Sequence, residues 1–258
     1  MIYDCFLFFN ELDLLEIRLL ELAAVVDRFV LVEATKTFQG APKPLFFAQH
    51  RDRFANFLDR IIHVVVDEEP EGLDAWGREH YQRNQMVRGL VGCDPDDVVL
   101  ISDLDEIPRP SAILDYQDEP GIKALMQDFY YYFLNCKSVY FKWPWGTRMV
   151  YFRDLTTPQD IRNHEDVTRV INGGWHFSFL GGVDRIIEKL EAFSHTEFNA
   201  DYYKDPLRLR AIIEAGQDLF DRDLFDYEVV PLDESFPEVV LRRRSDFSHL
   251  IREVEPSR

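Results

Sequence analysis

The chain has few cysteines and no long apolar run. Cys5, Cys93 and Cys136 are odd in number and widely spaced, with no Cys-x-x-Cys pair. This argues against a disulfide framework and favours a reducing, cytoplasmic setting. No stretch reaches the roughly 18 apolar residues that a membrane helix needs, and no basic leader precedes the first apolar run. We therefore expect neither a signal peptide nor a membrane span.

Positive charge is also scarce. The 258 residues include 29 Lys and Arg against 47 Asp and Glu, which gives a formal net charge of −18. Such a charge opposes binding to nucleic acid or to an anionic membrane surface. A neutral partner is expected, or an anionic one that meets local basic residues or a metal ion.

Strands and helices alternate over the first hundred residues. Apolar runs predict strands over 3–9, 29–33, 61–66 and 98–101, and the segments between them predict helices over 12–26, 51–58 and 75–91. This order is typical of a parallel sheet with helical crossovers. We expect one α/β domain over 1–258, with a nucleotide-binding half over 1–107 and an acceptor-binding half over 108–258.

The second half is aromatic and mixed rather than doubly wound. Strands are expected over 129–134, 138–142, 148–152 and 173–179, and helices over 111–116, 183–193 and 208–215. Pro108 and Pro110 are expected to break the chain, and Gly216 is a plausible helix C-cap. The sheet as a whole should be mixed and flanked by helices.

The densest group of chemically active side chains follows the strand over 98–101. Asp103, Asp105 and Glu106 arrive within four residues, at the carboxyl end of that strand, where ligands bind in open α/β sheets. Clustered carboxylates repel one another unless a cation neutralises them, and their hard oxygens suit Mg²⁺ or Mn²⁺. The segment therefore predicts a metal site that faces a phosphate.

Two enzyme classes place an Asp-x-Asp motif after a buried strand. Sugar-nucleotide transferases of the GT-A type use it to hold a divalent cation on a diphosphate. Haloacid-dehalogenase-like phosphatases would use Asp103 as the nucleophile, usually on the first strand of the domain. Three strands precede the motif here, which favours the transferase. A non-catalytic protein that binds a sugar nucleotide is a third alternative.

Several residues could contact a nucleotide. Arg78 and Arg83 could hold phosphate oxygens bidentately, or could only form charge pairs along their helix. Glu33 ends the second strand, where a carboxylate commonly meets a ribose, although a solvated acid is an equal alternative. Lys43 lies in a loop and is expected to be solvated.

The sequence offers more than one candidate for the metal ligands and for the catalytic base. His176 or His195 could join Asp105 as a metal ligand, while each taken singly is more simply structural. The candidates for a general base that deprotonates an acceptor hydroxyl are Asp184, Glu197 and Glu106. Asp184 could instead stabilise the start of its helix.

Two tryptophans are candidates for acceptor binding. Trp143 and Trp145 flank a proline in an expected loop. Exposed indoles there could stack on the apolar face of a sugar ring, or could pack over the edge of the sheet.

Taken together, these segments resemble glycosyltransferase family 17. The resemblance covers nearly the whole chain and is carried by FNELDLLEIRL at 9–19, FVLVEA at 29–34, REHYQRNQ at 78–85, ISDLDEIP at 101–108 and GWHFS at 174–178. It implies a GT-A-type fold, with Asp103 and Asp105 as the metal and diphosphate site and Asn10 among the donor-binding residues.

The resemblance also implies a reaction. A member of this family would transfer N-acetylglucosamine from UDP-GlcNAc to a glycan or glycoconjugate hydroxyl, with inversion, in a β-1,4 linkage and with Mn²⁺ or Mg²⁺. The expected lack of an anchor or leader makes the chain look like a free-standing, bacterial-type member, so its acceptor is expected to differ from that of the animal enzymes.

Overall fold

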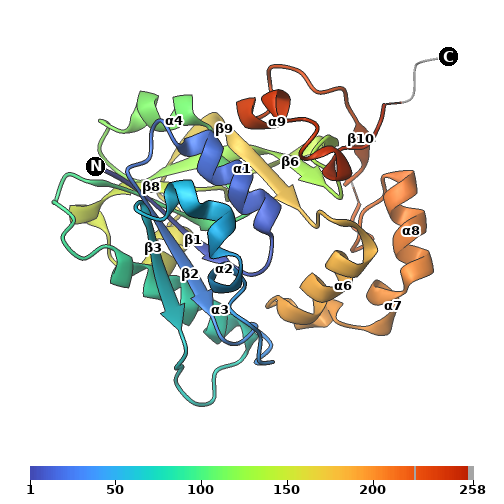
Figure 1. Ribbon diagram of the computed structural model, residues 1–258, viewed down its shortest axis with the longest axis horizontal. Coiled ribbons are helices and arrows are strands. Elements are labelled where there is room, and N and C mark those ends of the chain that lie inside the picture. Colours follow the sequence, from blue (N-terminus) through green and yellow to red (C-terminus); the bar gives the residue numbers. More distant parts are fainter. Residues whose placement is uncertain (224, 255–258) are drawn as a thin grey trace.

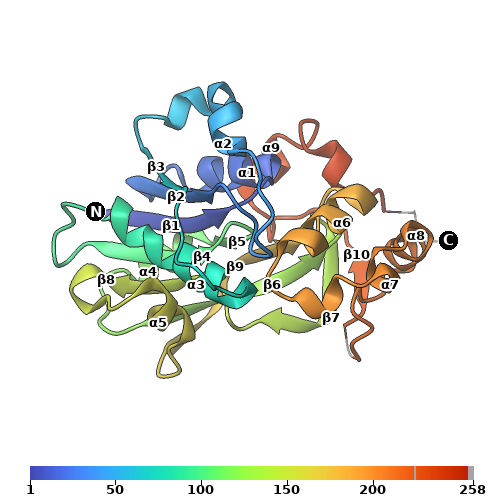
Figure 2. The same cartoon turned by 90° about the horizontal axis from the view of Figure 1, so that it is seen from below.

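A ten-stranded mixed sheet forms the centre of the protein. The computed structural model describes residues 1–223 and 225–254. Eight strands follow the order β10-β7-β6-β8-β4-β1-β2-β3, while β5 and β9 join the sheet off this path. Figure 1 shows strands of both halves in the middle of the molecule, with helices around them. Helices cover the sheet, as Figure 2 shows for α1, α2 and α9 on one side and α3 and α5 on the other. The predicted mixed α/β sheet flanked by helices is confirmed.

The first half is parallel, as the sequence predicts. Its strands are β1 (Ile2–Phe8), β2 (Arg28–Ala34), β3 (Ile61–Val66) and β4 (Val98–Asp103). Its helical segments are α1 (Leu12–Leu22), α2 (Phe46–Gln49), η1 (Arg51–Phe57), α3 (Ala75–Asn84) and η2 (Gln85–Gly89). The strand β1 pairs in parallel with β2 on one side and β4 on the other. The direction of connection therefore reverses at β1, and such a switch point is where open α/β sheets bind ligands.

The second half mixes parallel and antiparallel pairs. Its strands are β5 (Glu106–Pro108), β6 (Lys123–Tyr131), β7 (Cys136–Trp143), β8 (Arg148–Tyr151), β9 (Thr168–Ser178) and β10 (Tyr227–Val229). Its α-helices are α4 (Pro110–Tyr116), α5 (Pro158–Asn163), α6 (Gly182–Ala192), α7 (Asp201–Lys204), α8 (Pro206–Ala215) and α9 (Glu238–Arg242). Short 3₁₀ helices are η3 (Phe152–Asp154), η4 (Thr196–Phe198) and η5 (Ser248–Leu250). β8 lies antiparallel to β4 and β6 and thereby joins the two halves.

Several predicted bounds are wrong. The strand predicted over 129–134 is the end of β6, which begins at Lys123, and the strand predicted over 173–179 is the end of β9. The sequence does not predict β5, because prolines follow closely. Pro108 is tolerated there because β5 is short and pairs only with β9. Gly216 adopts the left-handed conformation, with φ 66°, that its predicted C-cap role requires.

Apolar side chains fill both faces of the sheet. One buried cluster packs α1 and α9 against β1, β2 and β4, and a second packs η2 and α5 against the opposite face. A third, aromatic cluster lies between the β6–β7 region and α6 with α8. In the described part of the chain, no helix is long and apolar enough to cross a membrane.

Candidate functional site

The main cavity lies at the switch point. It has a volume of about 460 Å³ and is lined by residues that follow β1, β2 and β4, by α3, α5 and α6, and by aromatic residues of β6, β7 and β9. Eight of the predicted site residues line it: Arg83, Asp103, Asp105, Glu106, Trp143, Trp145, His176 and His195. The topology thus brings together segments that are far apart in the sequence.

The cavity lining carries more basic than acidic residues, although the chain as a whole is acidic. Six basic residues line it, namely Lys36, Lys43, Arg83, Arg162, Lys189 and Arg222, against five acidic ones, Glu11, Glu79, Asp103, Asp105 and Glu106. The whole chain carries a formal charge of −18. Because the lining is not acidic while the chain as a whole is, the cavity is better suited to an anionic ligand than the rest of the protein.

Arg18 fixes the Asp-x-Asp turn from behind. This α1 side chain is fully buried and pairs with Asp4 on β1 through two hydrogen bonds of 2.8 and 2.6 Å. Its Nη1 donates to the backbone carbonyls of Asp103, Leu104 and Glu106 at 2.9–3.1 Å. Because one guanidinium holds three carbonyls, the turn that carries the carboxylates has a defined shape.

Asp103 is held between two arginines. Its Oδ1 accepts a 2.8 Å hydrogen bond from Arg83, and its Oδ2 lies 3.4 Å from Nη2 of Arg162. Burial raises the pKa of Asp103, but the two guanidinium groups outweigh that effect and hold the pKa below its ordinary value. Asp103 is therefore ionised, and it positions both arginines at the cavity wall.

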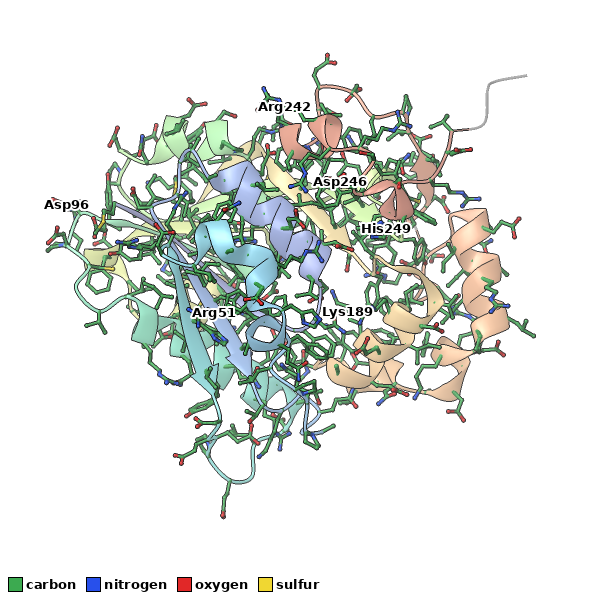
Figure 3. The ribbon with its side chains drawn as sticks, in the orientation of Figure 1. Arg51, Asp96, Lys189, Arg242, Asp246 and His249 are labelled. Carbon is green, nitrogen blue, oxygen red and sulfur yellow. The ribbon has the colours of Figure 1, made fainter. Side chains whose placement is uncertain are left out.

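Asp105 faces a lysine and a histidine. Its Oδ2 accepts a 2.8 Å bond from Nζ of Lys189, and its Oδ1 lies 3.5 Å from Nε2 of His176. Burial raises the pKa of Asp105, but Lys189 and His176 more than compensate and hold it well below its usual range. Figure 3 labels Lys189, which reaches from α6 toward the parallel half of the sheet.

Glu106 is bound within the protein on both oxygens. It is buried, and its carboxylate pairs with both terminal nitrogens of Arg162. Oε1 also accepts a 2.6 Å bond from the indole of Trp143, and Oε2 accepts one from the Asp103 amide. Glu106 thus orients Arg162 and Trp143, while its predicted role as a general base stays a prediction.

Asp103 and Asp105 could hold a divalent cation together with the phosphate oxygens of a ligand. Among the described residues, no group of three or more His, Cys, Asp or Glu side chains is arranged to hold a metal ion. Mg²⁺-type sites commonly use one or two carboxylates and complete their shell with substrate phosphates and water. Asp103 and Asp105 fit that pattern, provided that Lys189 moves aside from Asp105.

Three of the predicted donor-binding residues lie outside the cavity lining. Glu33 is fully buried, and its oxygens accept from the Phe47 amide and contact His63, each at 3.0 Å. Arg78 pairs with Glu69 at 2.9 Å. Asn10 lines a smaller neighbouring cavity of about 160 Å³. Their predicted contacts with a donor stay predictions.

The remaining candidates for the base and the metal shell lie at the rim or beyond it. Asp184 is exposed in the first turn of α6 and does not line the cavity. Glu197 lies outside the lining and pairs with His195 at 2.7 Å, and His195 packs against the Trp76 ring. In contrast, His176 is buried beside Asp105, and its Nδ1 has no hydrogen-bond partner among the described residues.

The two tryptophans behave differently. Trp143 is the last residue of β7, and its ring stacks on Phe129 with centroids 5.6 Å apart. Trp145 follows in the turn, lines the cavity and is 53% exposed. Trp145 therefore offers a free aromatic surface on this side of the cavity. The ring of Trp143 packs on Phe129, and its indole nitrogen donates to Glu106.

The sequence did not single out Arg18, Arg162 or Lys189. The sequence does contain a sign that Arg18 is buried, because this charged residue lies on the apolar face of an amphipathic helix. Arg162 and Lys189 lie on α5 and α6, and no local pattern separates them from ordinary surface residues. Only the fold brings them to the carboxylates.

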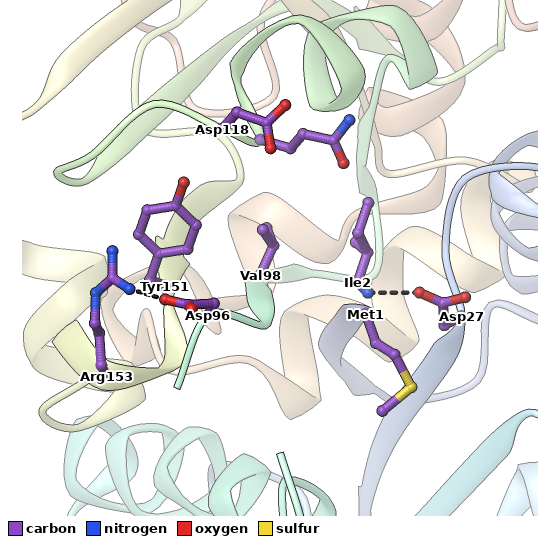
Figure 4. A pocket seen from close by; sticks show the side chains of 9 residues that line it. Met1, Ile2, Asp27, Asp96, Val98, Asp118, Tyr151 and Arg153 are labelled. Atoms are coloured by element: carbon purple, nitrogen blue, oxygen red, sulfur yellow. Dashed lines mark hydrogen bonds and ion pairs between the residues drawn. The ribbon is translucent and has the colours of Figure 1, made fainter. Parts of the chain in front are cut away.

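A second cavity, of about 370 Å³, lies at the opposite edge of the sheet, at the amino ends of β1 and β4. Figure 4 shows Ile2 bonded to Asp27 and Asp96 paired with Arg153. This is the edge at which open α/β sheets do not usually bind ligands.

Comparisons with known proteins identify the family of the chain. The sequence matches glycosyltransferase family 17 over residues 1–242. It is similar to the enzymes of Homo sapiens and Rattus norvegicus named β-1,4-mannosyl-glycoprotein 4-β-N-acetylglucosaminyltransferase, each 36% identical over 113 residues, which are 41% of this chain and 21% of theirs. The chain therefore matches about a fifth of the length of these curated relatives.

Among solved structures, the chain is similar to glucosyl-3-phosphoglycerate synthase of M. tuberculosis. The alignment covers 68% of this chain and 71% of that one, with 12% identity and a TM-score of 0.36. The family match spans most of the chain and favours the transferase over the phosphohydrolase: the chain belongs to glycosyltransferase family 17.

Proposed function

We propose that this glycosyltransferase transfers N-acetylglucosamine from UDP-GlcNAc to a glycan or glycoconjugate hydroxyl, with inversion and in a β-1,4 linkage, using Mn²⁺ or Mg²⁺ at Asp105. The observation that carries the proposal is the pairing of the Asp-x-Asp carboxylates with a ring of basic side chains at the switch point. The printed names of the relatives support the sugar and the linkage.

The basic residues suit the leaving diphosphate. In the reaction the acceptor oxygen bonds to the anomeric carbon, the bond from that carbon to the phosphate oxygen breaks, and the hydroxyl proton passes to a base. Arg83 and Arg162 are already held near Asp103, so they need little reorganisation to stabilise the new negative charge. Lys189, once released from Asp105 by a bound cation, is free to reach the same phosphate oxygens. A bound divalent ion would add Lewis-acid stabilisation of the departing UDP.

The acceptor is expected on the side opposite the parallel strands. Trp145 exposes its ring there, next to Trp143 at the β7 end of the cavity. A neutral sugar ring can stack on such a surface without any charge partner.

A calorimetric titration tests the donor and the metal together. Wild-type protein should bind UDP in Mn²⁺ and much more weakly after chelation, and Asp105→Asn should lose the metal-dependent part. Asp118→Asn is the matched control, because Asp118 is exposed beside the opposite cavity. Equal UDP binding by wild type and Asp105→Asn would refute the metal assignment.

A transfer assay separates an enzyme from a binding protein. Incubation with UDP-GlcNAc and a panel of glycans should release UDP and add one N-acetylhexosamine to an acceptor, detected by mass. Donor binding with neither release nor transfer across the panel would support the non-catalytic alternative instead.

A further inference from the structure

Lys43 is the least satisfied charged group at the cavity. It lies in the loop between β2 and α2 and lines the cavity, and its Nζ is buried with no hydrogen-bond partner in the described part of the chain. The ammonium lies 5.6 and 5.7 Å from the ring centroids of Phe9 and Phe46. Cation–π contacts return only part of the free energy that a buried, unbonded ammonium loses on leaving water.

The neighbouring acids do not supply the missing partner. Glu33 already binds the Phe47 amide and His63, and Glu11 binds the Asn10 amide and lies 3.6 Å from Lys189. Burial lowers the pKa of Lys43, and the attraction of the two glutamates offsets this only in part. The position is therefore costly for the donor-free protein, which is typical of a residue kept for a ligand.

Lys43 is held by different elements of the cavity wall from the diphosphate residues. Arg83, Arg162 and Lys189 gather at the carboxylates after β4, whereas Lys43 packs on the residue after β1 and on α2. Phe9 and Phe46 meet edge to face there, with centroids 6.0 Å apart. A nucleotide whose diphosphate lies at β4 can direct its base toward this aromatic corner.

We propose that Lys43 donates a hydrogen bond to the carbonyl at position 4 of a uracil base and thereby selects the donor nucleotide. The inference rests on the proposed function, since it assumes a nucleotide donor in this cavity. Cytosine carries an amino group at that position and adenine has no carbonyl, so an ammonium donor cannot bond to either one in this way.

Binding of UDP, CDP and pyrophosphate to Lys43→Met tests this inference. We expect wild type to prefer UDP over CDP by at least tenfold, about 1.4 kcal/mol. The variant should bind UDP at least tenfold more weakly and keep its affinity for CDP and pyrophosphate. Its Tm without ligand should rise, because an unbonded buried charge is removed. Lys43→Gln should weaken UDP binding in the same direction.

A lysine outside the cavity provides the control. Lys204→Met removes an ammonium that pairs with Glu191 and should leave all three affinities unchanged. The inference fails if Lys43→Met binds UDP as wild type does. Equal losses for UDP, CDP and pyrophosphate would place the ammonium on a phosphate and overturn the assignment to the base. Failure of wild type to bind UDP would instead overturn the proposed function, and this inference with it.

Discussion

Replacing Arg18 by methionine tests how the catalytic turn is held. The variant removes a guanidinium that is 0% exposed and leaves the equally buried Asp4 without its partner. Breaking a buried ion pair from one side costs about 3–5 kcal/mol, because the remaining charge is uncompensated. In a chain of this size such a loss should lower Tm by roughly 10 °C.

The same substitution should loosen the donor site. Three backbone carbonyls of the Asp-x-Asp turn, at Asp103, Leu104 and Glu106, lose the donor that they share. We therefore expect weaker UDP binding even under conditions where the variant is fully folded. Urea denaturation gives the free energy of unfolding, and calorimetry gives the affinity.

Two controls identify the cause of the loss. The double variant Arg18→Met with Asp4→Leu should recover part of the stability, because neither charge is left unpaired. Arg242→Met removes an exposed pair with Glu238 and should cost less than about 0.5 kcal/mol (Figure 3). A loss for Arg18→Met as small as that for Arg242→Met would refute the reasoning.

Three further predictions concern the cavity wall. Arg162→Met leaves Glu106 buried without a guanidinium, so the free energy of unfolding measured in urea should fall by about 3 kcal/mol. UDP binding should weaken as well, and an unchanged urea midpoint would contradict this prediction. Trp145→Ala should change the free energy of unfolding by less than about 1 kcal/mol but raise the acceptor KM at constant UDP affinity, measured by initial rates. Burial raises the pKa of Asp105, but its cationic neighbours hold the pKa below the ordinary value. The carboxylate should therefore stabilise the fold at neutral pH and lose that contribution as the pH falls below about 4. In thermal unfolding, Asp105→Asn should show a smaller fall of Tm over this acid range than the wild type does.

The parallel half of the fold was readable from the sequence. Runs such as Val98–Ile101 are buried on both faces, so they stand out as continuous apolar segments. β5 and β10 were not predicted, since three-residue strands carry almost no periodicity and Pro108 argues against a strand. The predicted bounds of β6 and β9 are also wrong, because β6 contains buried polar residues such as Lys123 and Gln127, and β9 begins with exposed polar residues.

The candidate site was predictable only where its residues are neighbours in sequence. Asp103, Asp105 and Glu106 share one turn, and strand-end chemistry identified them. Their counter-ions Arg162 and Lys189 come from α5 and α6, and only the tertiary fold brings them close. From the sequence, an acid at a strand end that faces a ligand looks the same as one that bonds within the protein. Glu33 is of the second kind, because its carboxylate bonds to the Phe47 amide and to His63.

A crystal structure with UDP and Mn²⁺ tests the central claim most directly. We predict anomalous manganese density in direct contact with Asp105, Lys189 displaced from that carboxylate, and the diphosphate between Arg83 and the metal. Density for UDP at any other place on the protein, or a diphosphate in this cavity with Lys189 still paired to Asp105 and no manganese beside it, would contradict the account.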